Sequence, residues 1–479
     1  MKNEKTISVA TGPSPAAADE SAPAGWGLVV VWSAEEPDRV GEVALLPARG
    51  APRVLGRGEP EDGDDEPRVT FVRQRPGHMA GTRPLSDPAI SRRQLSVRPR
   101  GTGGLEVERL GRCALSVNGA IVDRGVVGEG DTVAVRGRLV LVCVRRDAEM
   151  TDAASFPRSA APRFGEADDV GMVGESPAAW RLRDQLAFAA AAGKHVLVHG
   201  GSGTGKELAA RAIHQLSPRA DGPFVARNAA TLPPALIDAE LFGNARNYPN
   251  QGMAERPGLV GQAHGGTLFL DELAELPAEL QAHLLRVLDA DGEYQRLGEA
   301  SERRSDFRLV GATNRPLSAF KDDLLARLTL RVELPALEAR REDVPLLARA
   351  LLLSAAKGSP AAERFVRTGD GGRLEPRIDP DLIDALVRRS YATHVRELDA
   401  LLWRAMAASV GDTVVLPEEL RTGPRQEPTG EQIRASLARE KGNVRRAALA
   451  LGLSSRYGLY RLMKKHGIAI EPDAEPEDP

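Results

Sequence analysis

The sequence predicts a multidomain protein with an N-terminal all-β domain, a central α/β domain followed by a helical extension, and a C-terminal all-α domain. A chain of 479 residues is too long for one hydrophobic core and corresponds to roughly three domains. Short β-type runs fill the first part, strand and helix patterns alternate in the middle, and helical periodicity dominates the end. Only Cys113 and Cys143 are present, which excludes a disulfide scaffold and a cysteine-rich zinc site.

Composition and net charge narrow the function classes. The chain is 42% hydrophobic and 27% charged, as globular proteins are. Its net charge of −3 gives no overall attraction to nucleic acid, so any such contact must come from a local basic patch. Residues 1–25 are rich in Ala, Pro and Ser, predict a disordered tail and lack the apolar core of a signal peptide. Because no early apolar run could span a bilayer, we expect a cytoplasmic protein without membrane contact.

Residues 26–146 are predicted to form an all-β sandwich. Short runs such as GLVVVW (27–32), QLSVRP (94–99) and RLVLVCV (138–144) are separated by clusters of Gly, Pro and Asp. Strands of this length between turn residues are typical of sandwiches. The polar, proline-containing segment 147–169 is expected to be a linker.

Residues 170–342 are predicted to form an α/β domain around a parallel sheet. Three runs read as buried strands, HVLVHG (195–200), GTLFLDE (266–272) and FRLVGATN (307–314), and a helical stretch follows each. Strands that alternate with helices favour a parallel arrangement. Residues 343–418 are expected to be mostly helical.

The clearest motif is GGSGTGKE, which follows the first of these strands and opens a helical stretch. Glycines let backbone N–H groups surround phosphate oxygens, the helix presents its positive N-terminal end, and the lysine neutralises the β- and γ-phosphates. This is a P-loop arrangement, and it predicts ATP as the ligand. The predicted binding residues are Gly200, Gly201, Ser202, Gly203, Thr204, Gly205, Lys206 and Glu207.

Glu207 stands where Ser or Thr usually contacts Mg²⁺, so either the metal is held differently or binding is impaired. The second strand ends in two acids, Asp271 and Glu272. Asp271 is a candidate to hold Mg²⁺, directly or through water, and Glu272 to polarise the attacking water as a general base. The third strand ends in Thr313-Asn314, polar groups suited to sensing the γ-phosphate.

Residues 172–403 resemble the AAA+ domain of bacterial enhancer-binding proteins, the sigma-54-dependent transcription activators. The matching stretches are GGSGTGKELAARAIHQLS, PFVARNAATL, ELFG, GGTLFLDELAELPAELQAHLLRVL, VGATNRPL and YATHVREL. The resemblance implies a P-loop ATPase with a helical lid over 343–418, assembled into a ring, a hexamer in that family. Glu follows the P-loop lysine in this family, so Glu207 conforms to it.

The resemblance also implies roles for single residues. Asn228 would switch the catalytic Glu272, Asn314 would be the first sensor residue, and Arg396 in HVREL the second. In these ring ATPases, arginines from one subunit complete the neighbour's site. Arg327 fits the second such arginine.

Lys321 stands where the first of these trans arginines is expected. A lysine is a point charge without the planar fork of a guanidinium, which predicts some loss of hydrolytic efficiency.

The loop that contacts sigma-54 in this family carries the sequence GAFTGA. In this chain the six corresponding positions are 247–252, with the sequence NYPNQG. The loop keeps its length, has lost the Phe-Thr pair, and contains Pro249, which restricts the backbone. One alternative is that the ATPase core remains while the output has diverged. The other is a loop variant that still docks on the RNA polymerase sigma-54 holoenzyme.

The C-terminal stretch 433–468 resembles the Fis-type helix-turn-helix that closes most enhancer-binding proteins. This domain is predicted at 430–470, between a linker at 419–429 and an acidic tail at 471–479. Nine Lys and Arg against two Glu over 431–470 give it a local net charge of +7, a footprint for DNA phosphates. The candidate DNA-binding residues are Arg456, Tyr457, Arg461, Lys464 and Lys465. The alternative is a basic helical hairpin that packs on the ATPase.

The N-terminal β domain resembles a forkhead-associated (FHA) domain, a reader of phosphothreonine. The stretches VLGR (54–57), ISRRQLSV (90–97) and SVNG (116–119) carry this resemblance. It implies a phosphate pocket lined by Arg57, Ser91 and Arg92, where charge-assisted hydrogen bonds are strong.

Two positions depart from the FHA pattern. Gln94 stands where the motif has a structural histidine, and the first Asn-Gly of the peptide-contacting loop is absent. A sandwich that no longer binds phosphopeptide is therefore the alternative.

The whole sequence is interpreted as an ATP-dependent, DNA-binding transcription regulator of the sigma-54 activator type, with a sensor for a phosphorylated partner or for its own phosphorylated chain. One alternative uses ATP only for assembly and does not remodel sigma-54. Another is a phosphopeptide-dependent scaffold with an idle ATPase.

Overall fold

The computed structural model describes residues 25–60, 66–233, 236–289, 292–369, 372–421, 430–439, 444, 447, 459, 463 and 466–468. They fall into two compact units, Met1–Leu416 and Pro417–Pro479. The predicted tails, apart from Gly25, lie outside the described residues.

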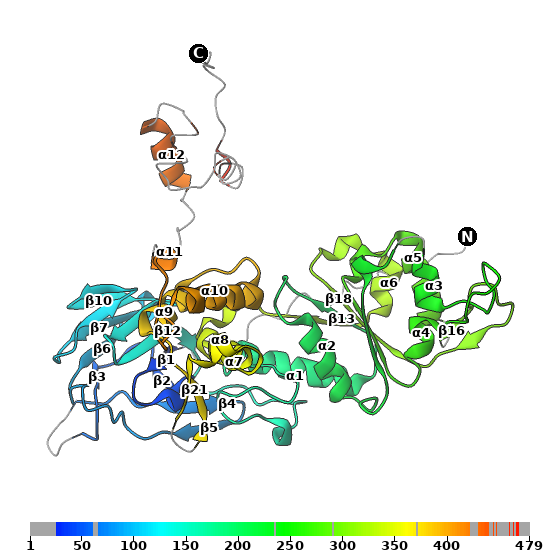
Figure 1. Ribbon diagram of the computed structural model, residues 1–479. Coiled ribbons are helices and arrows are strands. Elements are labelled where there is room, and N and C mark those ends of the chain that lie inside the picture. Colours follow the sequence, from blue (N-terminus) through cyan, green and yellow to red (C-terminus); the bar gives the residue numbers. More distant parts are fainter. Residues whose placement is uncertain are drawn as a thin grey trace, which may run out of the picture. The chain divides into compact units, whose positions relative to one another are not determined.

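The N-terminal part of the first unit is built from two antiparallel sheets that face a common apolar core (Figure 1). One sheet has the order β5-β4-β2-β1-β12-β11-β8-β9 and the other β10-β7-β6-β3. The strands are β1 (Gly25–Ser33), β2 (Val43–Leu46), β3 (Arg53–Leu55), β4 (Val72–Arg75), β5 (His78–Gly81), β6 (Leu95–Pro99), β7 (Leu105–Arg109), β8 (Leu115–Val117), β9 (Ala120–Val122), β10 (Arg124–Val127), β11 (Thr132–Val135) and β12 (Leu139–Arg146).

The apolar runs of β1 and β12 are continuous because both faces of these strands are buried. Leu28 and Leu141 point into the sandwich core, whereas Val29 and Val142, which are also buried, do not belong to that core. Helix α9 (Pro380–Arg388) packs against both strands and covers this second face. Burial on two faces therefore replaces the alternation expected of a half-exposed antiparallel sheet.

Polar contacts fix this seam between the sandwich and α9. The indole N–H of Trp32 donates to the carbonyl oxygen of Ile378 over 2.9 Å. The hydroxyl of Thr132 donates to the carboxylate of Asp384, which also pairs with Arg388 over 2.8 Å. The sandwich is thus joined to the helical part of the chain by both apolar and polar contacts.

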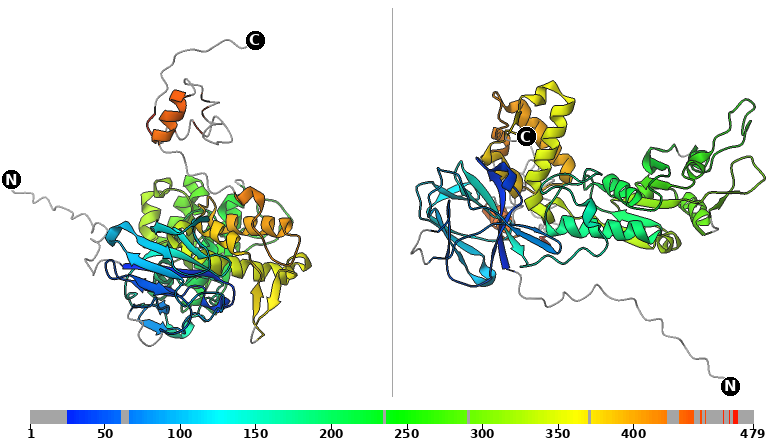
Figure 2. Two further views of the ribbon diagram at one scale, coloured as in Figure 1. Left: turned by 90° about the vertical axis from the view of Figure 1, so that its left-hand side faces the viewer. Right: turned by 90° about the horizontal axis from the view of Figure 1, so that it is seen from below.

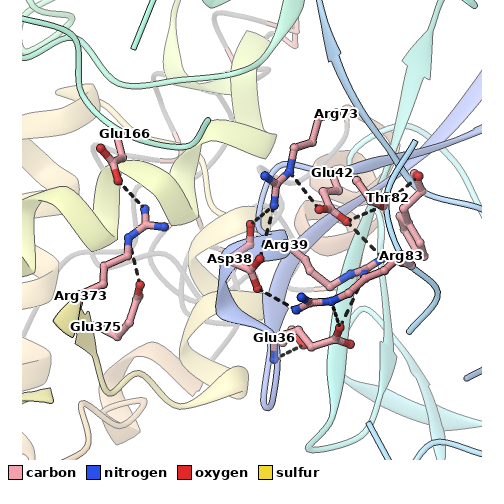
Figure 3. A network of polar contacts seen from close by, with 12 residues as sticks. Glu36, Asp38, Arg39, Glu42, Arg73, Thr82, Arg83, Glu166, Arg373 and Glu375 are labelled. Carbon is pink, nitrogen blue, oxygen red and sulfur yellow. Dashed lines mark hydrogen bonds and ion pairs between the residues drawn. The ribbon is translucent and has the colours of Figure 1, made fainter. Parts of the chain in front are cut away.

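An ion-pair network holds the connection between β1 and β2 (Figure 3). The guanidinium of Arg39, almost fully buried, lies between Glu36 at 3.5 Å and Glu42 at 3.1 Å. Arg73 reaches Glu42 over 3.1 Å, and Arg83 reaches Glu36 over 3.2 Å. Burial raises the pKa of Glu42, and the neighbouring arginines oppose that shift. Charged groups taken out of water need such partners.

The central part confirms the predicted parallel sheet, with strand order β14-β15-β18-β13-β19, in which neighbouring strands run parallel. Its strands are β13 (Val196–His199), β14 (Phe224–Asn228), β15 (Thr267–Asp271), β18 (Arg308–Thr313) and β19 (Leu330–Glu333). Its helices are α1 (Pro177–Ala192), α2 (Lys206–Gln215), α3 (Ile237–Phe242), α4 (Gly258–Gln262), α5 (Ala278–Asp289) and α6 (Asp322–Arg327).

Apolar clusters cover both faces of this sheet. Val196 and Val198 belong to the cluster that includes residues of α1 and α2, whereas Leu197 belongs to the one that includes residues of α3 to α6. Successive strand residues point to opposite faces, and each face here has its own helices. A short hairpin, β16 (Glu293–Tyr294) and β17 (Arg303–Arg304), leaves this domain between α5 and β18.

The helical extension of the first unit contains α7 (Val344–Gly358), α8 (Pro360–Glu363), α9 and α10 (His394–Ala408), whereas α11 (Glu418–Arg421) belongs to the second unit. The extension also contains a hairpin that the sequence did not predict, β20 (Val366–Thr368) and β21 (Leu374–Pro376). Near this hairpin, Arg373 pairs with Glu166 over 3.0 Å and with Glu375 over 3.4 Å (Figure 3).

The segment predicted as a polar linker is packed. Phe156 is buried and meets the ring of Trp180 edge-on, with ring centroids 5.9 Å apart. The carboxylate of Asp184 accepts the backbone N–H groups of Ser155 and Phe156 over 2.6 and 2.9 Å. One aromatic residue in a polar stretch was the sequence signal for this packing.

A buried carboxylate joins the start of α1 to the start of α7. Asp343 is 1% exposed and accepts hydrogen bonds from the N–H groups of Glu175 and Ser176 over 2.8 and 3.0 Å and from the Ser176 hydroxyl over 2.6 Å. Ser176 also caps α1, accepting the N–H of Ala179 over 3.1 Å. Glu175 in turn pairs with Arg75 of the sandwich, so three parts of the unit meet here.

A second buried pair at this junction predicts a pH-dependent stability. Glu342 lies 3.1 Å from Arg146, and burial raises its pKa to about 7, although Arg146 opposes the shift. Since the folded state binds this proton more tightly than the unfolded state, the free energy of unfolding falls as pH rises from about 4.5 to 7. We expect Glu342→Gln to lose this part of the pH dependence, and to be less stable than wild type because Arg146 is left without its ion-pair partner. Urea unfolding of wild type and Glu342→Gln between pH 5 and 8 measures how the free energy of unfolding depends on pH. The same pH dependence in both proteins would contradict the prediction.

The second unit has a small apolar core. Helix α12 (Gly430–Arg439) supplies Ile433, which clusters with Ala447, Leu459 and Met463. The predicted DNA-binding residues Arg456, Tyr457, Arg461, Lys464 and Lys465 lie outside the described residues. Throughout the described part of the chain, every helix is too short or too polar to traverse a bilayer.

Candidate nucleotide site

The P-loop residues form a tight turn between β13 and α2. Gly203 and Gly205 have φ of 80° and 99°, values that residues with a Cβ rarely adopt. The N–H of Gly200 donates to the carbonyl oxygen of Thr313 on the neighbouring β18 over 3.2 Å. Lys206, the first residue of α2, is 8% exposed and its ammonium donates to the carbonyl oxygens of Gly200 and Gly201 over 3.2 and 3.3 Å. The loop therefore brings a buried cation and a helix N-terminus to one place.

The P-loop candidates Thr204 and Glu207 differ in their surroundings. The hydroxyl of Thr204 donates to the carbonyl oxygen of Gly201 over 2.8 Å and so braces the turn. The side chain of Glu207 is 58% exposed and pairs with Arg211 one helical turn later, at 2.8 Å. Glu207 is thus a surface residue of α2 in this structure.

The acidic pair lies at the same sheet edge. β15 and β13 both pair with β18 in parallel, so the carboxyl ends of all three strands meet. The carboxylate of Asp271 accepts the N–H of Glu272 over 3.0 Å. Glu272 has φ 51° and ψ 43°, a left-handed conformation that costs energy in a residue with a side chain. Its Oε2 atom is buried and has no hydrogen-bond partner among the described residues.

The expected sensor residues of the core lie at the ends of neighbouring strands. Asn228, the last residue of β14, is in register with Asp271, and its amide oxygen accepts the N–H of Ala230 over 2.9 Å. This bond caps a short 3-10 turn, so the Asn228 side chain is engaged locally here. Thr313 is fully buried at the end of β18, and Asn314 after it is exposed.

The start of α10 lies directly on the P-loop. The guanidinium of Arg396 donates to the hydroxyl of Ser202 over 2.8 Å, and the N–H of Val395 donates to the carbonyl oxygen of Gly203 over 3.1 Å. A Cβ on Gly203 would lie 2.2 Å from the carbonyl oxygen of Thr393, so only glycine permits this approach. The structure thus places the expected lid arginine beside the loop.

Sequence analysis missed His394, which precedes these residues. A Cβ on Gly201 would lie 2.6 Å from its Nε2 atom, and its Nδ1 atom lies 3.5 Å from Glu338. Its position in the HVREL stretch, two residues before Arg396, was the available signal.

The two expected trans cations, Lys321 and Arg327, flank α6 and are both exposed. The backbone N–H of Lys321 donates to the side-chain oxygen of Gln281 on α5 over 3.2 Å, which fixes the start of α6. Their exposure leaves both side chains on the surface of this subunit.

The loop that replaces GAFTGA closes on itself. The N–H of Asn247 donates to the carbonyl oxygen of Met253, and its side-chain oxygen accepts the N–H of Gly252, both over 2.9 Å. The ring of Tyr248 covers Gly298 in the turn of the β16–β17 hairpin, where a Cβ would lie 2.3 Å from the ring.

A charged contact joins the same two segments. Glu255 pairs with Arg296, which is 8% exposed, and lies 3.9 Å from Arg303. The loop and the hairpin protrude together from the α/β domain (Figures 1 and 2). The loop and the hairpin contact each other, so they form one projection.

The three residues expected to bind phosphopeptide lie on adjoining segments of the sandwich. The N–H of Arg57 donates to the carbonyl oxygen of Ser91 over 3.2 Å. A Cβ on Gly56 would lie 1.8 Å from the carbonyl oxygen of Arg92, so glycine permits this approach. The Ser91 hydroxyl accepts the N–H of Arg112 over 3.2 Å, and Arg92 is exposed.

Gln94, which departs from the FHA pattern, is fully buried beside this group. Its side-chain oxygen accepts the N–H of Ser91 over 3.3 Å, and its amide donates to the carbonyl oxygen of Cys113 over 2.9 Å. A neutral amide therefore ties two segments of the sandwich together at this position.

Comparison with known proteins places these features in a family. Residues 172–334 match the family described as the sigma-54 interaction domain. The chain is 34% identical over 332 residues to the transcriptional regulatory protein ZraR of Salmonella typhimurium, a match that covers 65% of this chain and 71% of ZraR. It is 36% identical over 323 residues to the regulatory protein AtoC of Escherichia coli, which covers 61% of this chain and 67% of AtoC.

A solved structure also matches. NtrX from Brucella abortus, in complex with ADP, is 33% identical, and the match covers 63% of this chain and 70% of that chain with a TM-score of 0.46. The extent of the sequence match with ZraR decides the assignment. The chain belongs to the family of transcriptional regulators that carry a sigma-54 interaction domain.

Proposed function

We propose that the chain is an ATP-dependent, DNA-binding transcription regulator. The observation that carries this proposal is the meeting of the P-loop, the Asp271-Glu272 pair and Arg396 at one end of the parallel sheet. A buried lysine, a helix N-terminus and a nearby carboxylate pair together suit a magnesium-bound triphosphate. Steady-state ATP hydrolysis by the purified full chain tests it, and absence of turnover favours the alternatives with an idle ATPase.

The residues present fit Mg²⁺ as well as ATP. The described residues hold no cluster of three metal-binding side chains, so the ion would keep mainly water and phosphate oxygens as ligands, with Asp271 as the protein ligand. Bound there, Mg²⁺ would neutralise charge on the phosphate oxygens.

Glu272 is proposed as the general base. Its buried and unpartnered Oε2 atom is free to accept a proton from water as that water attacks the γ-phosphate. Lys206 would stabilise negative charge on the phosphates, and Arg396, already in contact with the P-loop, would report the nucleotide to the lid. Asn228 and Asn314 would position the base and sense the γ-phosphate, as the family resemblance implies.

Subunits are proposed to assemble as a ring in which Lys321 and Arg327 reach the neighbour's site. Both side chains are exposed, as this role requires. Because a guanidinium matches phosphate with two parallel N–H groups and an ammonium does not, we expect Lys321→Arg to raise the ATPase rate several-fold. Hydrolysis assays at a protein concentration that saturates assembly measure it; an unchanged rate would count against a role for position 321.

The regulator is proposed to have a diverged output. Residues 247–252 lack the Phe-Thr pair, and the loop is braced against the β16–β17 hairpin by Tyr248 and Glu255. Contact with sigma-54 holoenzyme in the family manner is therefore not expected, and ATP would drive assembly on DNA. In vitro transcription with sigma-54 holoenzyme, with and without ATP, decides between a diverged output and the family's contact with sigma-54. ATP-dependent transcripts would contradict the proposal that the output has diverged.

DNA binding is proposed to reside in 430–470, supported by the local charge of +7 and the apolar cluster around Ile433. A phosphothreonine sensor is proposed at Arg57, Ser91 and Arg92, supported by the hydrogen bond from the Arg57 N–H to the Ser91 carbonyl oxygen and by the close approach of Gly56 to Arg92. Calorimetry with phosphothreonine peptides and their unphosphorylated counterparts tests this input. Equal heats would favour a sandwich that serves only as a scaffold.

A further inference from the structure

A cavity of about 620 Å³ lies away from the P-loop, where the sandwich, the packed linker, α1 and the 3-10 segment Leu337–Asp343 meet. Its walls come from the end of β12, from residues 147–153, from the first turns of α1 and from residues 338–342. Of these walls, Glu338 also contacts the nucleotide site, through His394.

Two buried arginines in this cavity have unsatisfied guanidinium groups. Arg340 is 7% exposed and makes no hydrogen bond or ion pair through its guanidinium to any residue that the structure describes. Arg146 is 5% exposed and pairs with Glu342, yet its Nε and Nη1 atoms have no hydrogen-bond partner within the described ranges. Burial lowers the pKa of Arg340. Buried cations without partners are costly, and native proteins normally pair them.

The acids nearest to Arg340 in sequence are already engaged. Both carboxylate oxygens of Asp343 accept hydrogen bonds from Glu175 or Ser176. Glu338 accepts the N–H of Tyr391. The charge of Asp343 raises the pKa of Arg340 against the effect of burial, but neither acid is hydrogen-bonded to the Arg340 guanidinium among the described residues.

The other acids of the lining lie at the mouth of the cavity, in water. Glu129, Asp147, Glu149 and Asp152 are exposed, so solvent screens their charge. Asp184 is occupied by the N–H groups of the linker. The buried part of the lining thus holds two arginines and the carboxylate of Glu342, whereas the acids at the rim are exposed to solvent.

We propose that this cavity binds a small molecule through a phosphate group, with Arg340 and Arg146 as its ligands. A guanidinium donates two parallel hydrogen bonds to an oxyanion, and the Nε and Nη1 atoms of Arg146 and the Nε atom of Arg340 have no hydrogen-bond partner among the described residues. The cavity exceeds the size of a bare phosphate, and its acidic rim suits hydrogen-bond donors on the rest of the ligand. A ligand bound in the cavity would contact both the sandwich and residues 338–342, which lead into α7.

Equilibrium dialysis with radiolabelled inorganic phosphate tests the proposal on the full chain. All proteins carry Lys206→Ala, so that the P-loop does not contribute, and ionic strength is held constant with chloride. We expect saturable binding of one phosphate per chain, and a loss of affinity of at least about tenfold when Arg340→Gln is added. Absence of saturable binding, or equal binding by the Arg340→Gln protein, would overturn the proposal.

Arg181→Gln is the matched control, because this arginine lines the same cavity but is exposed at its rim. It removes the same charge, and we expect it to keep phosphate affinity within about twofold. An equal loss of phosphate affinity in Arg181→Gln and Arg340→Gln would mean that binding depends only on the overall charge, and would overturn the proposed site.

Melting temperature separates a ligand site from a structural role. In phosphate-free buffer, Arg340→Gln should melt at the same temperature as its parent or higher, since an unpaired buried charge has been removed. A lower melting temperature in that buffer would assign Arg340 a structural role and overturn the proposal. This test is independent of the proposed ATPase, because the readout is phosphate binding in a P-loop variant.

Discussion

Glu272→Gln is expected to lower the steady-state rate of ATP hydrolysis by about 10²–10⁴-fold while Mg-ATP affinity stays within a few-fold of wild type. The amide keeps the size of the carboxylate but cannot take a proton from water. The unpartnered Oε2 atom shows that the carboxylate is not held by another side chain of the described chain, so its loss should act on chemistry rather than on folding.

Two measurements accompany this prediction. Calorimetric titration with Mg-ATP confirms that the variant still binds, and Glu363→Gln serves as the control because Glu363, on α8, is exposed and is not one of the expected nucleotide-site residues. The control should keep its rate within about twofold. A Glu272→Gln protein that hydrolyses ATP at the wild-type rate would remove Glu272 from the proposed mechanism.

Asp343→Ala is expected to destabilise the first unit by about 3–5 kcal/mol, the largest stability effect that the structure predicts. The substitution strands two backbone N–H groups and the Ser176 hydroxyl, all of which the carboxylate accepts. It also weakens the cap of α1, because Ser176 is held in place by the same carboxylate.

Urea unfolding followed by tryptophan fluorescence measures this loss, since Trp180 donates to Glu175 at the same junction over 3.1 Å. Asp343→Asn is the graded control, because the amide retains one oxygen and should lose less stability than alanine. A loss of less than about 1 kcal/mol for Asp343→Ala would show that water replaces the carboxylate at no great cost.

The parts of the structure that sequence analysis predicted are those encoded by local patterns. The runs at 195–200, 266–272 and 307–314 became β13, β15 and β18, because apolar strands bounded by glycines and acids are recognisable without their partners. The P-loop followed from its glycines and lysine together with the strand pattern before them and the helical pattern after them. Asp271 and Glu272 could be assigned to the same sheet edge, because parallel strands bring their carboxyl ends together.

The missed elements depend on contacts between distant residues. β14 contains Arg227 and β19 contains Arg331, and both strands lie at the edges of the sheet, where the apolar signal is weak. Helix α9 packs on β1, although the two elements are more than 300 positions apart in the sequence. The hydrogen bond from Trp32 to Ile378, just before α9, spans a similar separation. No pattern within one segment could encode the packing of Phe156 on Trp180 or the approach of Arg396 to Ser202.

Calorimetric titration of Mg-ATP into the wild type and into Lys206→Ala tests most directly whether one nucleotide bridges the P-loop and the acidic pair. Because the lysine ammonium is buried within the loop, the account predicts one site per subunit in the wild type and affinity at least about 10²-fold weaker in the variant. No heat from the wild type, or equal affinity in both proteins, would contradict it.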